Sequence, residues 1–117
     1  MGRAMSAGIY KMLLAQGASF NLALTYRDPA GVLIDLTGYA AHMRAAVSKG
    51  EAPVLQASTD NGQIVIEGPL GVVMIDLPAS LTDSLEPGQY VYQLDLTSPG
   101  GQVTRLLEGA LLVDGQV

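Results

Sequence analysis

The sequence predicts an all-β fold, an antiparallel sandwich of about seven or eight short strands with one short helical turn. Three observations predict it. Apolar residues alternate with small or polar residues in several short runs, which is the period of a strand with one buried face. Turn residues separate these runs, since the chain holds 14 Gly and 6 Pro. The length of 117 residues fits one domain.

Composition excludes several classes of protein. Apolar residues make up 49% of the chain and charged residues 15%, which excludes an intrinsically disordered chain. A net charge of −5 with only six Lys and Arg argues against a nucleic-acid partner. The absence of Cys excludes disulfides, thiolate metal sites and a thiol nucleophile. No apolar run is long enough for a membrane helix, so we expect no membrane partner.

The first half of the chain contains two expected strands. Residues 19–26 alternate strictly, and Phe20, Leu22, Leu24 and Tyr26 are expected to face inward. A turn at 27–31 leads to a second apolar run at 32–34, which ends at 35–38. Residues 39–47 fit a helix or a strand. We favour the strand, with Tyr39, Ala41, Met43, Ala45 and Val47 inward and Ala40, His42, Arg44 and Ala46 outward.

The second half contains the remaining expected elements. Runs at 54–58 and 63–67 flank Asn61-Gly62, a pair that favours a tight hairpin. A strand at 72–77 precedes one helical turn at 78–85, where Leu81 and Leu85 share a face. The final strands are expected at 90–97, 102–107 and 110–113. The last two are separated by Glu108-Gly109, where a bulge or bend is expected. We divide the chain into an N-terminal arm or first edge strand (1–17) and a single sandwich domain (18–117).

Candidate chemistry is sparse. Most Asp residues fall in or beside predicted turns, where Asp bonds to nearby backbone, so we expect no carboxylate pair. Asp60-Asn61 belongs to a turn and lacks the spacing of a calcium loop. His42 is the one His and has no acid beside it in the sequence. The tyrosines at 26, 39, 90 and 92 are read as core residues. We therefore expect a non-enzymatic protein with no catalytic residue, cofactor or metal.

A resemblance to a known family begins at residues 31–44, where Asp35-Leu36-Thr37-Gly38 stands out. Together with 20–26, 62–66, 81–96, Gly100-Gly101 and 107–113, this stretch resembles the immunoglobulin-like β-sandwich domains of tailed-phage virions. The N-terminal domain of phage baseplate upper proteins is the most similar of these. The resemblance implies a non-enzymatic virion structural protein, an adaptor or assembly subunit of the tail, baseplate or fibre attachment region. The alternatives are a capsid decoration protein and a β-sandwich module that binds carbohydrate or a host surface.

The same resemblance sets the expected partners and location. We expect other virion proteins as partners, a homo-oligomer in the particle, and a virion location after assembly in the bacterial cytoplasm. The N-terminal segment, Met1 to Tyr10, is expected to lie on a neighbouring subunit. The candidate subunit-interface residues are Arg3, Met5, Ile9, Tyr10, His42 and Arg44.

Overall fold

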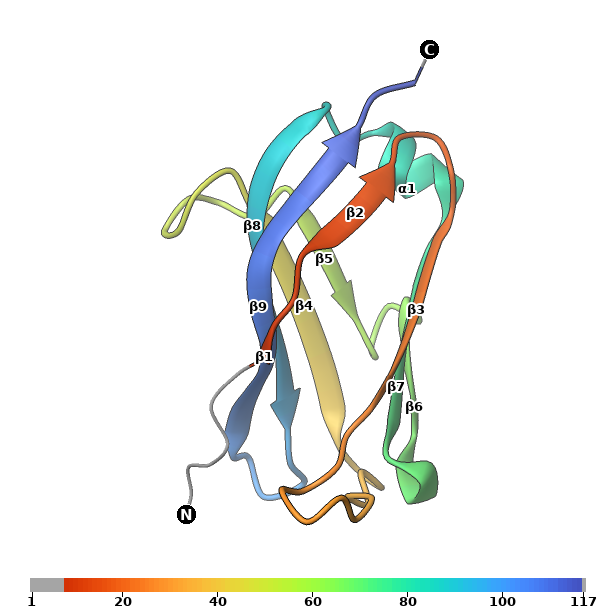
Figure 1. The fold of residues 1–117 in the computed structure, drawn as a ribbon, viewed down its shortest axis with the longest axis vertical. Coiled ribbons are helices and arrows are strands. Elements are labelled where there is room, and N and C mark those ends of the chain that lie inside the picture. The colour runs from red at the N-terminus through yellow and green to blue at the C-terminus, as the bar shows by residue number, and fades with distance from the viewer. Residues whose placement is uncertain (1–7, 117) are drawn as a thin grey trace.

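The computed structural model describes residues 8–116 as two β-sheets packed face to face (Figure 1). The larger sheet has six strands in the order β1-β9-β8-β4-β5, with β2 also paired to β9. Its strands are β1 (Gly8–Ile9), β2 (Met12–Ala15), β4 (Ala40–Ala46), β5 (Leu55–Ser58), β8 (Gly88–Thr97) and β9 (Val103–Asp114). The smaller sheet contains β3 (Phe20–Thr25), β7 (Val72–Leu77) and β6 (Ile64–Glu67), in that order.

The predicted β-sandwich is confirmed, including its single short α-helix. Helix α1 (Ala79–Asp83) follows β7, and a 3-10 turn (Gly68–Leu70) joins β6 to β7. The strand interpretation of 39–47 is also confirmed, because β4 buries every second residue against the core. The inward residues of β4 and β8 are at most 8% exposed: Ala41, Met43, Ala45, Tyr90, Tyr92, Leu94 and Leu96.

One inward assignment is wrong, and the apolar run at 32–34, for which no strand was predicted, lies in a turn. Val47 is 62% exposed, because β4 ends at Ala46 and the chain leaves the sheet there. Residues 32–34 form no strand, and only an isolated bridge joins Leu33 to Arg27. Asp28 explains this, since its Oδ1 accepts hydrogen bonds from the backbone N–H groups of Ala30 and Val32 and holds the segment as a turn.

The predicted hairpin at Asn61-Gly62 is wrong. Strands β5 and β6 lie on either side of this turn, but β5 pairs with β4 and β6 pairs with β7. The turn therefore carries the chain from one sheet to the other. Asn61 fixes its shape, because its Oδ1 accepts hydrogen bonds from the N–H groups of Ser58 and Gln63. The position of the turn was predicted correctly, but the pairing of its flanking strands was not.

The predicted break at Glu108-Gly109 is also wrong, because β9 runs without interruption from Val103 to Asp114. The irregularity in β9 lies a few residues earlier in the chain, at Leu106. Leu94 of β8 pairs with Leu107, whereas Asp95 pairs with Arg105, so Leu106 is an extra residue.

The N-terminal strands run parallel to β9, in contrast to the antiparallel pairing elsewhere in the structure. Gly8 pairs with Leu107 in β1, and Met12 pairs with Leu111 in β2. Both strands keep one register along the same edge of β9, and Tyr10 and Lys11 interrupt the pairing between them. We call these two residues the β1–β2 junction. Two hydrogen bonds of the Tyr10 backbone hold it in place. The Tyr10 N–H donates to the Glu108 carbonyl over 3.1 Å, and its carbonyl accepts from the Tyr92 hydroxyl over 2.5 Å.

Candidate binding groove on the six-stranded sheet

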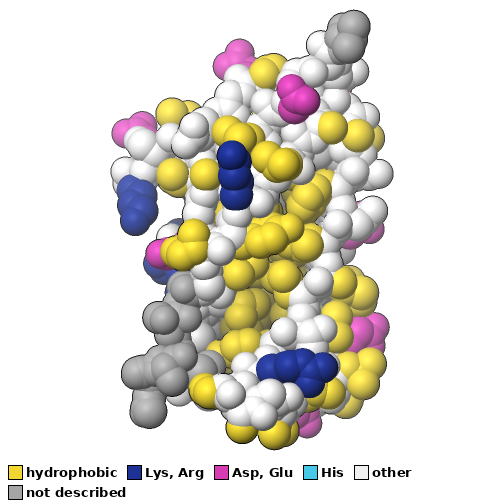
Figure 2. Space-filling model, in the orientation of Figure 1, with side chains coloured by type: hydrophobic (Ala, Val, Ile, Leu, Met, Phe, Trp, Pro, Cys, Tyr) yellow, Lys and Arg dark blue, Asp and Glu magenta, His cyan; other side chains and the backbone are white. Residues whose placement is uncertain are grey.

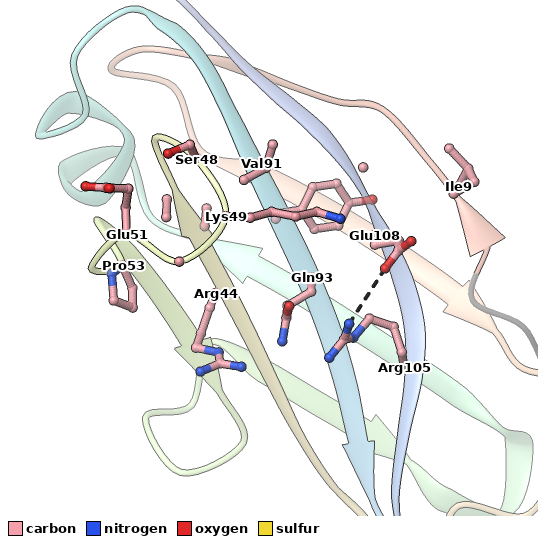
Figure 3. Close-up of a pocket in the computed structure, with 15 residues that line it drawn as sticks. Ile9, Arg44, Ser48, Lys49, Glu51, Pro53, Val91, Gln93, Arg105 and Glu108 are labelled. Atoms are coloured by element: carbon pink, nitrogen blue, oxygen red, sulfur yellow. Dashed lines mark ion pairs between the residues drawn. The ribbon is translucent and has the colours of Figure 1, made fainter.

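A groove of about 520 Å³ lies on the outer face of the six-stranded sheet. Strands β4, β8 and β9 form its floor, β1 borders one side, and the loop at 47–54 between β4 and β5 overhangs the other (Figure 3). It is lined by Ile9, Arg44, Ala45, Ala46, Ser48, Lys49, Gly50, Glu51, Pro53, Val91, Tyr92, Gln93, Arg105, Glu108 and Gly109. Its size is in the range of ordinary ligand pockets in proteins.

One wall of the groove is a charged network centred on Arg105. Its Nε lies 2.7 Å from Asp95 Oδ1, and its Nη1 lies 3.7 Å from Glu108 Oε1. Gln93 Nε2 donates to the second oxygen of Asp95 over 3.2 Å. The hydrogen bond with Asp95 is the largest of the effects that raise the pKa of Arg105. Arg105 is therefore held in place and already neutralised by its own neighbours.

The extra residue in β9 is what brings this network together. In a regular strand, Arg105 and Glu108 are three residues apart and would point to opposite faces of the sheet. The register shift at Leu106 places Arg105 opposite Asp95 and Glu108 opposite Gln93, all on the outer face. No sequence signal marks this shift, so sequence reasoning missed Arg105, Glu108 and Gln93.

Two further cations in the groove have no such neutralising partner. Arg44 lies between Gln56 of β5 and Gln93 of β8, both of which are uncharged. Lys49 projects from the overhanging loop across the groove (Figure 3). Within residues 8–116, neither side chain makes a hydrogen bond or ion pair. Both are exposed, and their charges are available to a ligand.

The groove also concentrates the positive charge of an acidic protein. Arg44, Lys49 and Arg105 are three of the six Lys and Arg in the chain, and they face two lining carboxylates, Glu51 and Glu108. The remainder of the chain carries three cations against nine carboxylates, one of which is the Asp95 that binds Arg105. The groove therefore differs in charge from the rest of the molecule.

Apolar side chains complete the lining. Ile9 is 79% exposed at the edge of the groove, and Val91 and Pro53 lie on the floor and in the loop. A largely exposed Ile beside unpaired cations is typical of a surface that buries an apolar group of a partner.

Tyr92 anchors the floor of the groove from within the sandwich. Its ring is 4% exposed, and its hydroxyl donates to the Tyr10 carbonyl. Burial is the main reason that the pKa of Tyr92 rises to about 12, and the neighbouring Tyr10 adds to the effect. The hydroxyl therefore remains a hydrogen-bond donor at every physiological pH. Its bond to Tyr10 holds the β1–β2 junction beside Ile9.

The candidate interface residues that the structure describes fall into three groups. Ile9 and Arg44, far apart in the sequence, line the groove together. His42 lies on the same face of the sheet outside the groove, where its Nε2 is 3.0 Å from Gln56 Oε1. Tyr10 is 41% exposed and lies in the β1–β2 junction beside the groove, where its carbonyl accepts a hydrogen bond from Tyr92. Arg3 and Met5 lie outside the described residues.

Neither a metal-binding cluster of side chains nor a membrane-spanning helix occurs among the described residues. Within residues 8–116, no cluster of three or more His, Cys, Asp or Glu side chains could hold a metal ion. His42 stands opposite Asp95 across the β4–β8 pair, but that carboxylate is bound to Arg105. No helix among these residues is long and apolar enough to cross a membrane.

The fold and the groove define the class: the chain is an immunoglobulin-like β-sandwich with a ligand-sized groove on one sheet. No protein-family model matches the sequence, and no curated protein matches it. Among solved structures, the chain is similar to the crystal structure of CopC from Methylosinus trichosporium OB3b. The TM-score is 0.48 and the identity 16%, over 97% of this chain and 90% of that chain.

These comparisons correct the expected function. The structural similarity is to CopC, and nothing in the comparisons points to a phage tail, baseplate, fibre or capsid protein. The physical reason lies in the motif at 35–38. Asp35 Oδ1 accepts hydrogen bonds from the N–H and hydroxyl of Thr37, Leu36 is fully buried, and Gly38 adopts a φ of 82°. The motif therefore forms a turn that seats one core residue, and a turn of this kind carries information about fold rather than function.

Proposed function

We propose that this protein is a non-enzymatic binding module whose groove binds an acidic segment of a partner protein. The observation that carries the proposal is a pair of cations, Arg44 and Lys49, that have no carboxylate partner among residues 8–116 and lie at an open groove in an otherwise acidic molecule. Charge complementarity of this kind steers association and selects the partner.

The lining specifies the character of that segment. Arg44 and Lys49 supply N–H donors for a carboxylate, while Ile9, Val91 and Pro53 supply contact area for an apolar side chain. The groove therefore suits an extended segment in which acidic and apolar residues alternate. A nucleic acid fits poorly, because the nine carboxylates elsewhere would repel its phosphates.

A pair of labelled peptides tests the proposal. One is a hexapeptide of alternating Glu and Leu, and the other has Gln in place of each Glu. We expect the acidic peptide to bind about tenfold more tightly than the neutral one in fluorescence anisotropy, with affinity falling as salt is added. The substitutions Arg44→Gln and Lys49→Gln each weaken binding of the acidic peptide by roughly three- to tenfold.

The matched control is Lys11→Gln, which removes the same charge from an exposed residue that does not line the groove. It should leave the affinity within about twofold of wild type. Equal binding of the two peptides would overturn the proposal. An effect of Lys11→Gln as large as that of Arg44→Gln would also overturn it, because the attraction would then come from net charge and not from the groove.

A further inference from the structure

Strand β3 forms an open edge of the three-stranded sheet. It pairs with β7 on one side only and lies in front of β7 and β6 in Figure 1. The Tyr26 N–H donates to the Gly71 carbonyl, which fixes the phase of hydrogen bonding along the strand. Because peptide groups alternate, Phe20, Leu22 and Leu24 bond to β7. Asn21, Ala23 and Thr25 therefore direct their N–H and C=O groups to the open side.

The core side of β3 is also incompletely covered. Phe20, Leu22 and Leu24 pair with Leu77, Ile75 and Val73 of β7 and share their inward face. The three β7 residues are at most 1% exposed, whereas the three β3 residues are only partly buried. Figure 2 shows a strip of hydrophobic side chains along the middle of this face of the molecule. The strip runs between β9 and β3.

This edge lacks the features that keep edge strands from pairing with other chains. Natural sheets protect their edges with charged side chains, Pro or bulges. Strand β3 has the sequence Phe-Asn-Leu-Ala-Leu-Thr, without charge or Pro, and its pairing with β7 is regular over six residues. The opposite edge strand, β6, carries Glu67. An unprotected edge of this length can pair with the strand of another chain.

We propose that the partner is β3 of a second copy, paired antiparallel about a two-fold axis at Ala23. This register opposes Ala23 to its own counterpart and Asn21 to Thr25, so that every free peptide group named above finds a partner. Leu22 then opposes Leu24 of the second copy on the core side, where both remain partly exposed in one copy alone. Two three-stranded sheets become one continuous sheet.

Charge is compatible with this register. The next residues along the strand pair Arg27 with Ser19 of the second copy, so no like charges stand opposite one another. The two-fold arrangement also leaves the six-stranded sheet and its groove uncovered. The dimer is therefore independent of the proposed peptide binding, and either can fail without the other.

The mass of the protein in solution tests the dimer, measured by light scattering and sedimentation from micromolar to millimolar concentration. We expect a monomer–dimer equilibrium in the wild type. Ala23→Lys, which places two like charges on the axis, should weaken dimerisation by about tenfold or more. Ala23→Pro removes the N–H at the axis and should have the same effect, since Pro is tolerated at an edge where the N–H faces outward.

The control is Ala40→Lys, which adds the same charge at an exposed alanine of β4 in the other sheet. It should dimerise like wild type, and circular dichroism should show all variants folded. A wild type that stays monomeric at millimolar concentration overturns the proposal, as does a dimer unchanged by both Ala23 substitutions. Amide protection of Asn21 and Thr25 that is lost only when residues 1–7 are deleted would also overturn it, because the strand covering β3 would then come from the same chain.

Discussion

Tyr92 shows how one hydroxyl can hold the β1–β2 junction in place. Tyr92→Phe removes the hydrogen bond to the Tyr10 carbonyl and leaves that carbonyl without its donor. We expect a loss of about 1–2 kcal/mol in the free energy of unfolding, measured by urea titration at neutral pH. Tyr10→Phe is the matched control, because Tyr10 takes part through its backbone, and it should change stability far less.

The same residue predicts a pH dependence. The pKa of Tyr92 is about 12 in the folded protein, against an ordinary value of 10.0. A folded pKa above the unfolded one stabilises the protein fully below the lower value, and that contribution is lost as pH rises from about 10 to 12. Wild-type stability should therefore fall across this interval more steeply than that of Tyr92→Phe. Parallel curves for the two proteins would contradict the assignment.

Gly109 is the other residue on which the β1–β2 junction depends. Its φ is 151°, and a Cβ at this position would lie 2.6 Å from the Tyr10 carbonyl oxygen. Gly109→Ala should therefore push the β1–β2 junction away from β9. The free energy of unfolding, measured by thermal unfolding, should fall by about 2 kcal/mol or more. At Gly100, a Cβ would meet nothing closer than 3.9 Å. Gly100→Ala should therefore be nearly neutral, and similar losses in both variants would refute this role for Gly109.

At the scale of elements, helix α1 is held by a buried threonine. Thr82 is fully buried, and its hydroxyl donates to the Ala18 carbonyl over 2.8 Å and accepts from the Gly17 N–H over 3.1 Å. These bonds join the helix to the turn between β2 and β3. Thr82→Val keeps the shape and removes them, so we expect a loss of about 1–3 kcal/mol in denaturant unfolding. Thr82→Ser retains the hydroxyl and should lose less. Equal losses would show that packing, not hydrogen bonding, holds the helix.

Elements also show what sequence reasoning can and cannot supply. Alternation predicted β3, β4 and β8 and their inward faces, because burial of one face imposes a period of two. Strand β7 was predicted from its apolar run, without an inward face. It could not show which strands pair, as the turn at Asn61-Gly62 demonstrates: a tight turn suits a hairpin and a crossing between sheets equally well. Sequence reasoning also missed the charged network of Arg105, Glu108 and Gln93 in the groove. The extra residue at Leu106 leaves no mark in the apolar pattern, yet it decides where Arg105 points.

At the scale of the whole molecule, the two sheets have different surfaces. The outer face of the six-stranded sheet gathers cations into a groove, while the three-stranded sheet ends in an uncharged open edge. Total charge and composition could not reveal this division, because both are averages over the chain. Ile9 and Arg44 could be selected as exposed candidates from the sequence, but only the fold places them in one groove.

The parallel pairing of β2 with β9 has a consequence for synthesis. Met12 pairs with Leu111, so this strand leaves the ribosome well before its partner does. At the usual rate of translation, the intervening residues take about 5–20 seconds to make. Throughout that time Met12 and Leu14, which are buried in the finished protein, have no β9 to pair with. The six-stranded sheet can therefore be completed only after β9 has emerged.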